Sequence, residues 1–167
     1  MSIRRALNSL PSKPGIILAV IVSITVLSVF YYQQYRSCSE IASLRSELYE
    51  GVKQHVGKVV HLVDITPFTW GKVRMIINHQ NKGKVLDCPF EWDWTQKQRK
   101  QLMANGQLNV MAFARKDVNT VVDFKKEMID FVVKETILKP DTALFKVEKH
   151  GANDHGYILR QITDIER

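Results

Sequence analysis

The feature that most constrains this chain is an uncharged apolar stretch over residues 15–32. No charged residue occurs between Lys13 and Arg36. About 20 apolar residues, at about 1.5 Å each, cross the hydrocarbon core of a bilayer. A lone segment in lipid satisfies its backbone groups only as a helix. The sequence therefore predicts one transmembrane helix over residues 15–35.

The residues that flank this stretch predict its orientation. Three basic residues precede it, and no acidic residue does: Arg4, Arg5 and Lys13. The positive-inside rule then predicts that residues 1–14 are a basic cytoplasmic stub. Three tyrosines near the other end suit the opposite headgroup region. We expect a single-pass protein of a bacterial inner membrane, with its C-terminal domain in the periplasm.

A cleaved signal is the alternative interpretation of the stretch. Secretory signals have an apolar run of about 7–15 residues that ends in a small-x-small site. Here the run is longer and is followed by Tyr-Tyr-Gln-Gln-Tyr-Arg. A lipoprotein signal that ends at Cys38 would need small apolar residues where Tyr35 and Arg36 stand. These departures favour an uncleaved anchor.

The net charge of +7 is divided unevenly along the 167 residues. Residues 1–37 hold four of the 24 basic residues and none of the 17 acidic ones, so the remainder keeps a charge of only +3. A local cluster of Lys72, Arg74, Lys82 and Lys84 is typical of a solvated strand face. We therefore expect no direct contact with nucleic acid.

Helical spacing follows the apolar stretch. Ile41, Leu44, Leu48 and Val52 predict an amphipathic juxtamembrane helix within residues 36–57, with Ser39 as its N-cap. This helix either packs on the following domain or continues the transmembrane helix.

Strand periodicity dominates residues 58–167, the predicted periplasmic β-rich domain. The expected strands are 59–65, 72–77, 84–90, 108–115 and 120–125, with a hairpin of 143–150 and 155–162 and a short polar helix over 95–104. Residues 127–138 fit a helix or a strand, and their β-branched content favours a strand. The pattern predicts an α+β fold, either a mainly antiparallel sheet or a small curved barrel, with one or two helices.

The chain contains no recognised catalytic or metal-binding motif. Glu91 and Asp93 flank Trp92 beside Trp94, a pattern more typical of solvated loop carboxylates than of an acid–base pair. We expect a protein that is not an enzyme, with no cofactor and no metal site.

The two cysteines, Cys38 and Cys88, both follow the membrane span. An even count outside the membrane favours an intramolecular disulfide, which would close a loop of about 50 residues and contribute about 3–4 kcal/mol in the chain-entropy model. The alternative is that Cys88 is a buried thiol on the face of Leu86 and Phe90, with Cys38 paired between chains. We favour the intramolecular bond.

Five histidines also follow the span: His55, His61, His79, His150 and His155. His150 and His155 flank a four-residue turn, so the two imidazoles would lie close together and disfavour double protonation at mildly acidic pH. We interpret them as candidate pH sensors, with His61 as a further candidate. The competing interpretation is that both rings are solvated. A metal site at this pair lacks a third ligand nearby in sequence.

Two tryptophan-containing stretches, Thr-Trp-Gly-Lys-Val at 69–73 and Glu-Trp-Asp-Trp at 91–94, accompany a basic stub, one span and a β-rich domain. As architecture, the whole chain resembles the ToxS, FidL and PsaF group of small bitopic accessory proteins. The resemblance implies that the periplasmic domain binds and protects the periplasmic domain of a ToxR-like transcription activator in virulence regulation. It also implies a lipocalin-like barrel that can hold an amphipathic ligand. It assigns a role to no individual residue.

Two other classes of protein share this architecture. One is an immunity protein against a periplasm-acting toxin, and the other is a structural subunit of an envelope or secretion complex. Both need only an anchor and a binding domain, so the sequence leaves them open.

Overall fold

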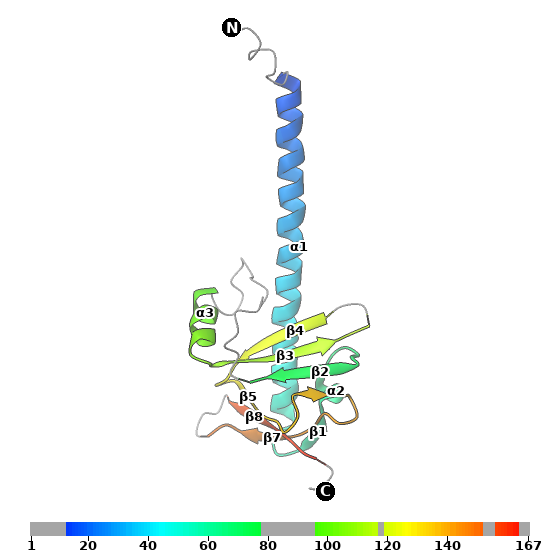
Figure 1. The fold of residues 1–167 in the computed structure, drawn as a ribbon, viewed down its shortest axis with the longest axis vertical. Helices are drawn as coiled ribbons and strands as arrows, with labels where there is room; N and C mark the ends of the chain where they lie inside the picture. Colours follow the sequence, from blue (N-terminus) through cyan, green and yellow to red (C-terminus); the bar gives the residue numbers. More distant parts are fainter. Residues whose placement is uncertain (1–12, 78–95, 117–118, 152–155, 164–167) are drawn as a thin grey trace, which may run out of the picture. The chain divides into compact units, whose positions relative to one another are not determined.

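The computed structural model describes residues 13–77, 96–116, 119–151 and 156–163 (Figure 1). The chain divides into two compact units, Met1–Ser37 and Cys38–Arg167. One helix, α1 (Lys13–Gln54), contributes residues to both units. Ser39 therefore lies inside a continuous helix, and its prediction as an N-cap is wrong.

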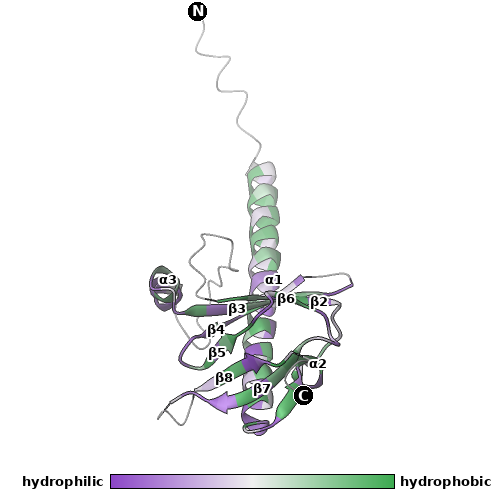
Figure 2. Cartoon of the chain, turned by 60° about the horizontal axis from the view of Figure 1, so that its bottom comes forward, coloured by the Kyte–Doolittle hydropathy of each residue, from purple (hydrophilic) through white to green (hydrophobic). Residues whose placement is uncertain are grey.

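Apolar side chains dominate the surface of α1 in the first unit. Every large apolar side chain from Ile16 to Tyr32 is exposed, and Figure 2 shows this stretch mainly in the colours of hydrophobic residues. Three hydroxyls donate hydrogen bonds of 2.8–2.9 Å to the carbonyl four residues earlier: Ser23, Thr25 and Ser28. By length and composition, this helix can span a membrane.

The second unit contains two four-stranded sheets among the residues that the structure describes. The first sheet has the order β1 (Val59–His61), β7 (Leu144–Lys149), β8 (Tyr157–Gln161) and β5 (Ile129–Val132). The second sheet has the order β4 (Asn119–Lys125), β3 (Leu108–Ala114), β2 (Lys72–Ile76) and β6 (Ile137–Leu138). Neighbouring strands are antiparallel except β5 and β8, which are parallel. Two short helices complete the unit, α2 (Leu62–Ile65) and α3 (Gln96–Ala104).

One hydrophobic core joins residues 38–54 of α1 to both sheets. Leu48 and Val52 of α1 are buried with Phe113 of the second sheet and Phe145 of the first. Asn109 on β3 is fully buried, and its amide donates hydrogen bonds of 3.0 Å to the Ile129 carbonyl and to Asp130 Oδ1. This amide connects the two sheets, because a buried donor must find a partner.

The α+β class is confirmed, whereas a closed barrel is wrong. Two separate sheets, each with its own edge strands, replace the barrel. Residues 127–138 contain strands β5 and β6 and no helix, in agreement with the strand that their β-branched content predicted.

The predicted strand 59–65 is wrong in its second half. Residues 62–65 form helix α2 instead, because Leu62 and Ile65 bury the same helical side and the Leu62 amide bonds to the Ala143 carbonyl. The predicted strand 84–90, the loop carboxylates Glu91 and Asp93, and Thr95 lie outside the described residues.

Candidate binding groove

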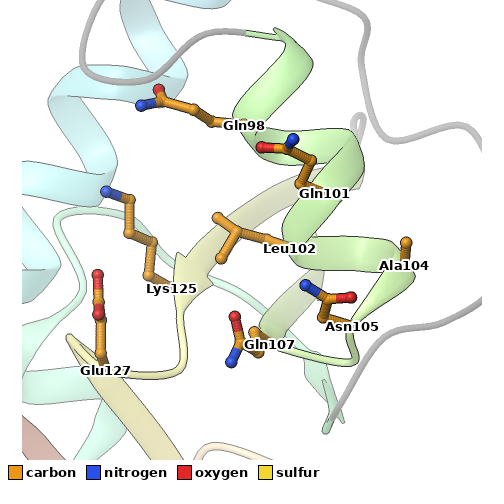
Figure 3. Close-up of a pocket in the computed structure, with 8 residues that line it drawn as sticks. All are labelled: Gln98, Gln101, Leu102, Ala104, Asn105, Gln107, Lys125 and Glu127. Atoms are coloured by element: carbon orange, nitrogen blue, oxygen red, sulfur yellow. The ribbon is translucent and has the colours of Figure 1, made fainter.

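An open groove lies between α3 and the turn that joins β4 to β5. Its larger hollow, of about 640 Å³, is lined by Gln98, Gln101, Leu102, Ala104, Asn105, Gln107, Lys125 and Glu127. A smaller hollow of about 210 Å³ shares four of these residues and adds Lys126 and His150. Figure 3 shows Leu102 pointing from α3 into the space between the helix and Lys125. We call the two hollows together the α3 groove.

Backbone hydrogen bonds fix the walls of the α3 groove. The Gln107 amide bonds to the Leu102 carbonyl at 2.8 Å, and the Lys126 amide bonds to the Gln107 carbonyl at 2.9 Å. The His150 amide bonds to the Gly156 carbonyl at 2.8 Å. A Cβ at Gly156 would lie 2.6 Å from the Glu127 carbonyl, so only glycine permits this approach of the hairpin to the turn.

The lining of the α3 groove is rich in side-chain amides. Four amides can each donate and accept hydrogen bonds: Gln98, Gln101, Asn105 and Gln107. Lys125 and Lys126 add donors, and Glu127 adds an acceptor. Such a lining fits the polar surface or exposed backbone of another protein better than it fits a large apolar ligand.

A buried ion cluster holds α3 in place. Asp123 on β4 contacts Arg99 of α3 and Arg45 of α1, and all three residues are at most 8% exposed. Arg45 Nε donates to the Asp123 backbone carbonyl at 2.6 Å, while Arg45 Nη2 pairs with Asp123 Oδ1. Arg99 Nε lies 2.8 Å from Asp123 Oδ2, as an ion pair without the alignment of a hydrogen bond. The cluster connects α1, α3 and β4.

Sequence reasoning missed this cluster, although two signals for it exist. Asp123 interrupts the apolar run Val-Val-Asp-Phe of a strand, which indicates a buried and paired carboxylate. Arg45 falls on the same helical side as Ile41, Leu48 and Val52. Nothing in the local pattern, however, indicates that the two residues meet.

Of the predicted site residues, Cys38, His61 and His150 lie within the described ranges. Cys38 is buried at 2% exposure and is not a free thiol, while Cys88 lies outside the described residues, so their pairing stays a prediction. His150 lines the α3 groove, and His155 and His79 also lie outside the described part. His61 ends β1, is half-buried and lines neither hollow of the groove.

Two ionisable groups near the first sheet have shifted pKa values. A hydrogen bond from Arg160, supported by Lys146, holds the pKa of Glu148 below its usual value. Burial raises the pKa of Tyr49, whose ring packs 5.5 Å from the ring of Tyr157.

Within the described ranges, no group of three or more His, Cys, Asp or Glu residues could hold a metal ion. Comparison with protein families, curated proteins and solved structures gives no match. Function must therefore be inferred from the chain's own residues.

Proposed function

We propose that this chain is a single-pass membrane protein whose domain over residues 38–167 binds the periplasmic domain of a membrane-bound transcription regulator. The observation that carries the proposal is the contrast within α1. Its first part exposes every large apolar side chain, whereas its second part buries Leu48 and Val52 in the core of a folded domain. An anchor and a domain therefore share one helix.

The exposed part of α1 supports anchoring in a bilayer. Apolar surface in water costs about 25 cal/mol per Å², and soluble proteins rarely expose a continuous surface of this kind. The hydroxyls of Ser23, Thr25 and Ser28 already bond to their own helix, which is how polar groups are satisfied within lipid. Arg4, Arg5 and Lys13 before the span favour a cytoplasmic N-terminus.

The α3 groove supports a binding role for the domain. It is open, polar and built on backbone hydrogen bonds, and the buried cluster of Arg45, Asp123 and Arg99 fixes its helix. A rigid wall lowers the entropy lost when a partner binds. The regulator as partner follows from the architectural resemblance to ToxS-like accessory proteins.

The same groove supports a pH response of partner binding. His150 shares the smaller hollow with Lys125, Lys126 and Glu127, so the charged lining is already net positive. A net positive lining would favour an acidic group on the partner. If His150 is the pH sensor, His150→Gln should alter the dependence of partner binding on pH and His61→Gln should not, and an unchanged pH profile in His150→Gln would exclude this residue.

Crosslinking of the full tagged chain in the membranes of its own cells tests the proposal. The expected product contains a polypeptide with its own span and a cytoplasmic DNA-binding domain. Gln101→Arg in the α3 groove should reduce this product by about tenfold, whereas Gln54→Arg, at an exposed position that ends α1, should leave it unchanged.

Other crosslinked partners would indicate a different function. A secreted toxin would indicate an immunity protein, and components of a secretion machine would indicate a structural subunit. Either result, reproduced with the Gln54→Arg control, contradicts a role beside a regulator.

A further inference from the structure

The outer side of the second sheet carries a surface that lies apart from the lining of the α3 groove. Side chains of directly paired residues project to the same side of a sheet. Arg74 pairs with Ala112 and with Ile137, and Ala112 pairs with Val121. Lys72 pairs with Ala114 at the next position along the same side. We call these residues the open sheet face: Lys72, Arg74, Ala112, Ala114, Val121 and Ile137.

Most other residues of the second sheet are covered by the main core or by α3. On the inner side, Val73, Met75 and Phe113 are at most 1% exposed and belong to the main core. On the outer side, Leu108 and Val110 are buried under Leu102 and Met103 of α3. The open sheet face is therefore the part of the outer side that α3 does not cover.

The open sheet face combines two small residues on its central strand with exposed apolar side chains beside them. Ala112 and Ala114 lie on β3, between longer side chains on β2 and β4. Val121 is 37% exposed and Ile137 is 49% exposed. Two small residues on a central strand allow the backbone of another chain to approach closely, and the exposed apolar groups can pack against it.

The charge of this face has one sign. Lys72 and Arg74 are exposed, and strands β2, β3 and β6 contain no acidic residue. The one carboxylate on β4 is Asp123, which is buried and paired with Arg45 and Arg99. The nearest acidic residue before β6 is Glu135, whose amide bonds to Gln161 of the first sheet.

We propose that the open sheet face binds an extended acidic segment of a partner protein. Lys72 and Arg74 are two residues apart on one strand, about 6.6–6.8 Å, which matches carboxylates two residues apart on an extended segment. The guanidinium and ammonium groups would bind these carboxylates, and an apolar residue of the segment would contact Val121 or Ile137. The proposal rests on the proposed function, because it assumes that the domain binds a protein.

Two cations with an apolar strip fit a protein segment better than other anionic partners. A nucleic acid presents a continuous row of phosphates, which proteins meet with six to ten cationic contacts or so. Recognition of anionic lipid headgroups typically uses about four to eight Lys or Arg in a cluster. The six residues of the open sheet face offer two cations, fewer than either of these partners requires, and a nucleic acid would leave the exposed Val121 and Ile137 without a contact.

Photocrosslinking in the full chain tests the proposal. A photoreactive phenylalanine replaces Val121 or Ile137, and, as matched controls, Val59 on β1 or Val132 on β5, which are 53% and 41% exposed on the first sheet. The chain is expressed in its own cells, and the crosslinked segment is sequenced by mass spectrometry. We expect adducts at positions 121 and 137 with a segment that has two acidic residues two apart, and at most background at 59 and 132.

Charge variants test the chemistry of the contact. Lys72→Glu with Arg74→Glu should reduce the adduct by at least about tenfold, and the corresponding Gln variants should give an intermediate loss. Lys58→Glu with Lys146→Glu makes the same charge change at exposed positions by the first sheet and should retain the adduct. The melting temperature of each variant verifies that the domain still folds.

Several outcomes would overturn the proposal: no adduct above the controls, a crosslinked segment without acidic residues, an adduct within the chain itself, or an adduct that survives the Glu variants. The outcomes also separate this surface from the proposed function. An acidic segment from a protein other than a regulator supports the surface and contradicts the function. A regulator captured only through positions 59 or 132 supports the function and contradicts the surface.

Discussion

The two parts of α1 have the same backbone conformation and opposite surroundings. Residues 16–32 expose all their large apolar side chains, whereas residues 38–54 bury one side, with Leu48 and Val52 at most 1% exposed, and expose Glu47, Glu50 and Lys53. The first part has no polar side to distinguish from an apolar one, and the second part has both. A uniformly apolar helix is typical of an apolar environment. A helix with one apolar and one polar side is typical of packing on a protein core.

Removal of the buried Asp123 carboxylate should destabilise the packing of the second part of α1 in its domain. Asp123→Ala removes the carboxylate that both Arg45 and Arg99 contact, and breaking a buried ion pair typically costs about 3–5 kcal/mol of unfolding free energy. Urea denaturation of the full chain in detergent measures the loss. The exposed Asp64→Ala serves as a control and should change stability by less than about 0.5 kcal/mol. A loss below about 1 kcal/mol for Asp123→Ala would show that the cluster does not secure the helix.

Cys38, the first residue of the second part of α1, should stabilise the domain through the predicted disulfide. If Cys38 pairs with Cys88, Cys38→Ser should lower the unfolding free energy by about 3–4 kcal/mol, because the open chain regains loop entropy. Peptide mapping without reductant should recover the two cysteines in one crosslinked peptide, and the neighbouring Ser37→Ala should have no effect. Two free thiols, or a bond between two chains, would refute the pairing.

A matched pair of leucines compares the two parts directly. Leu48→Ala removes a side chain that is 1% exposed and should cost about 3 kcal/mol of domain stability. Leu27→Ala makes the same change where the side chain is 55% exposed and should leave domain unfolding unchanged. Equal losses in the two variants would remove the distinction between the two parts.

The carboxylate of Glu148, near the surface, should affect stability less than these buried residues do. Because Arg160 holds the pKa of Glu148 below its usual value of 4.5, its stabilisation is present above that value and is lost as the pH falls through the folded pKa. Solvent screens this partly exposed pair, so we expect about 0.5 kcal/mol. Thermal melts from pH 7 to pH 3 should show a slightly smaller acid loss in Glu148→Gln than in the native chain. Glu135→Gln, at an exposed position, is the control, and identical acid profiles for all three proteins would contradict the pair.

Local patterns predicted most of the secondary structure. Alternation gave β2, β3 and β4, and the turn residues around Gly151, which adopts a positive φ of 62°, gave the β7–β8 hairpin. The hairpin needs only neighbouring residues, so its period and turn chemistry suffice. Helix α2 escaped detection because its four residues, Leu-Val-Asp-Ile, are too few to distinguish a helical period from a strand period.

Features that depend on distant residues were not predictable in the same way. The parallel pairing of β5 with β8 joins Ile129 to Tyr157, and no local period specifies a parallel partner. The α3 groove likewise combines α3, the β4–β5 turn and His150. Among the residues that line the groove, only His150 was a candidate site residue in the sequence. It was a candidate because of its predicted pairing with His155, which lies outside the described residues.

Enzyme fusions at the C-terminus test directly whether α1 divides a cytoplasmic stub from an outer binding domain. Alkaline phosphatase fused after Arg167 should be active, because the enzyme functions only outside the cytoplasm, and β-galactosidase at the same position should be inactive. A stable alkaline phosphatase fusion without activity, together with an active β-galactosidase fusion, would place the domain in the cytoplasm and contradict the account.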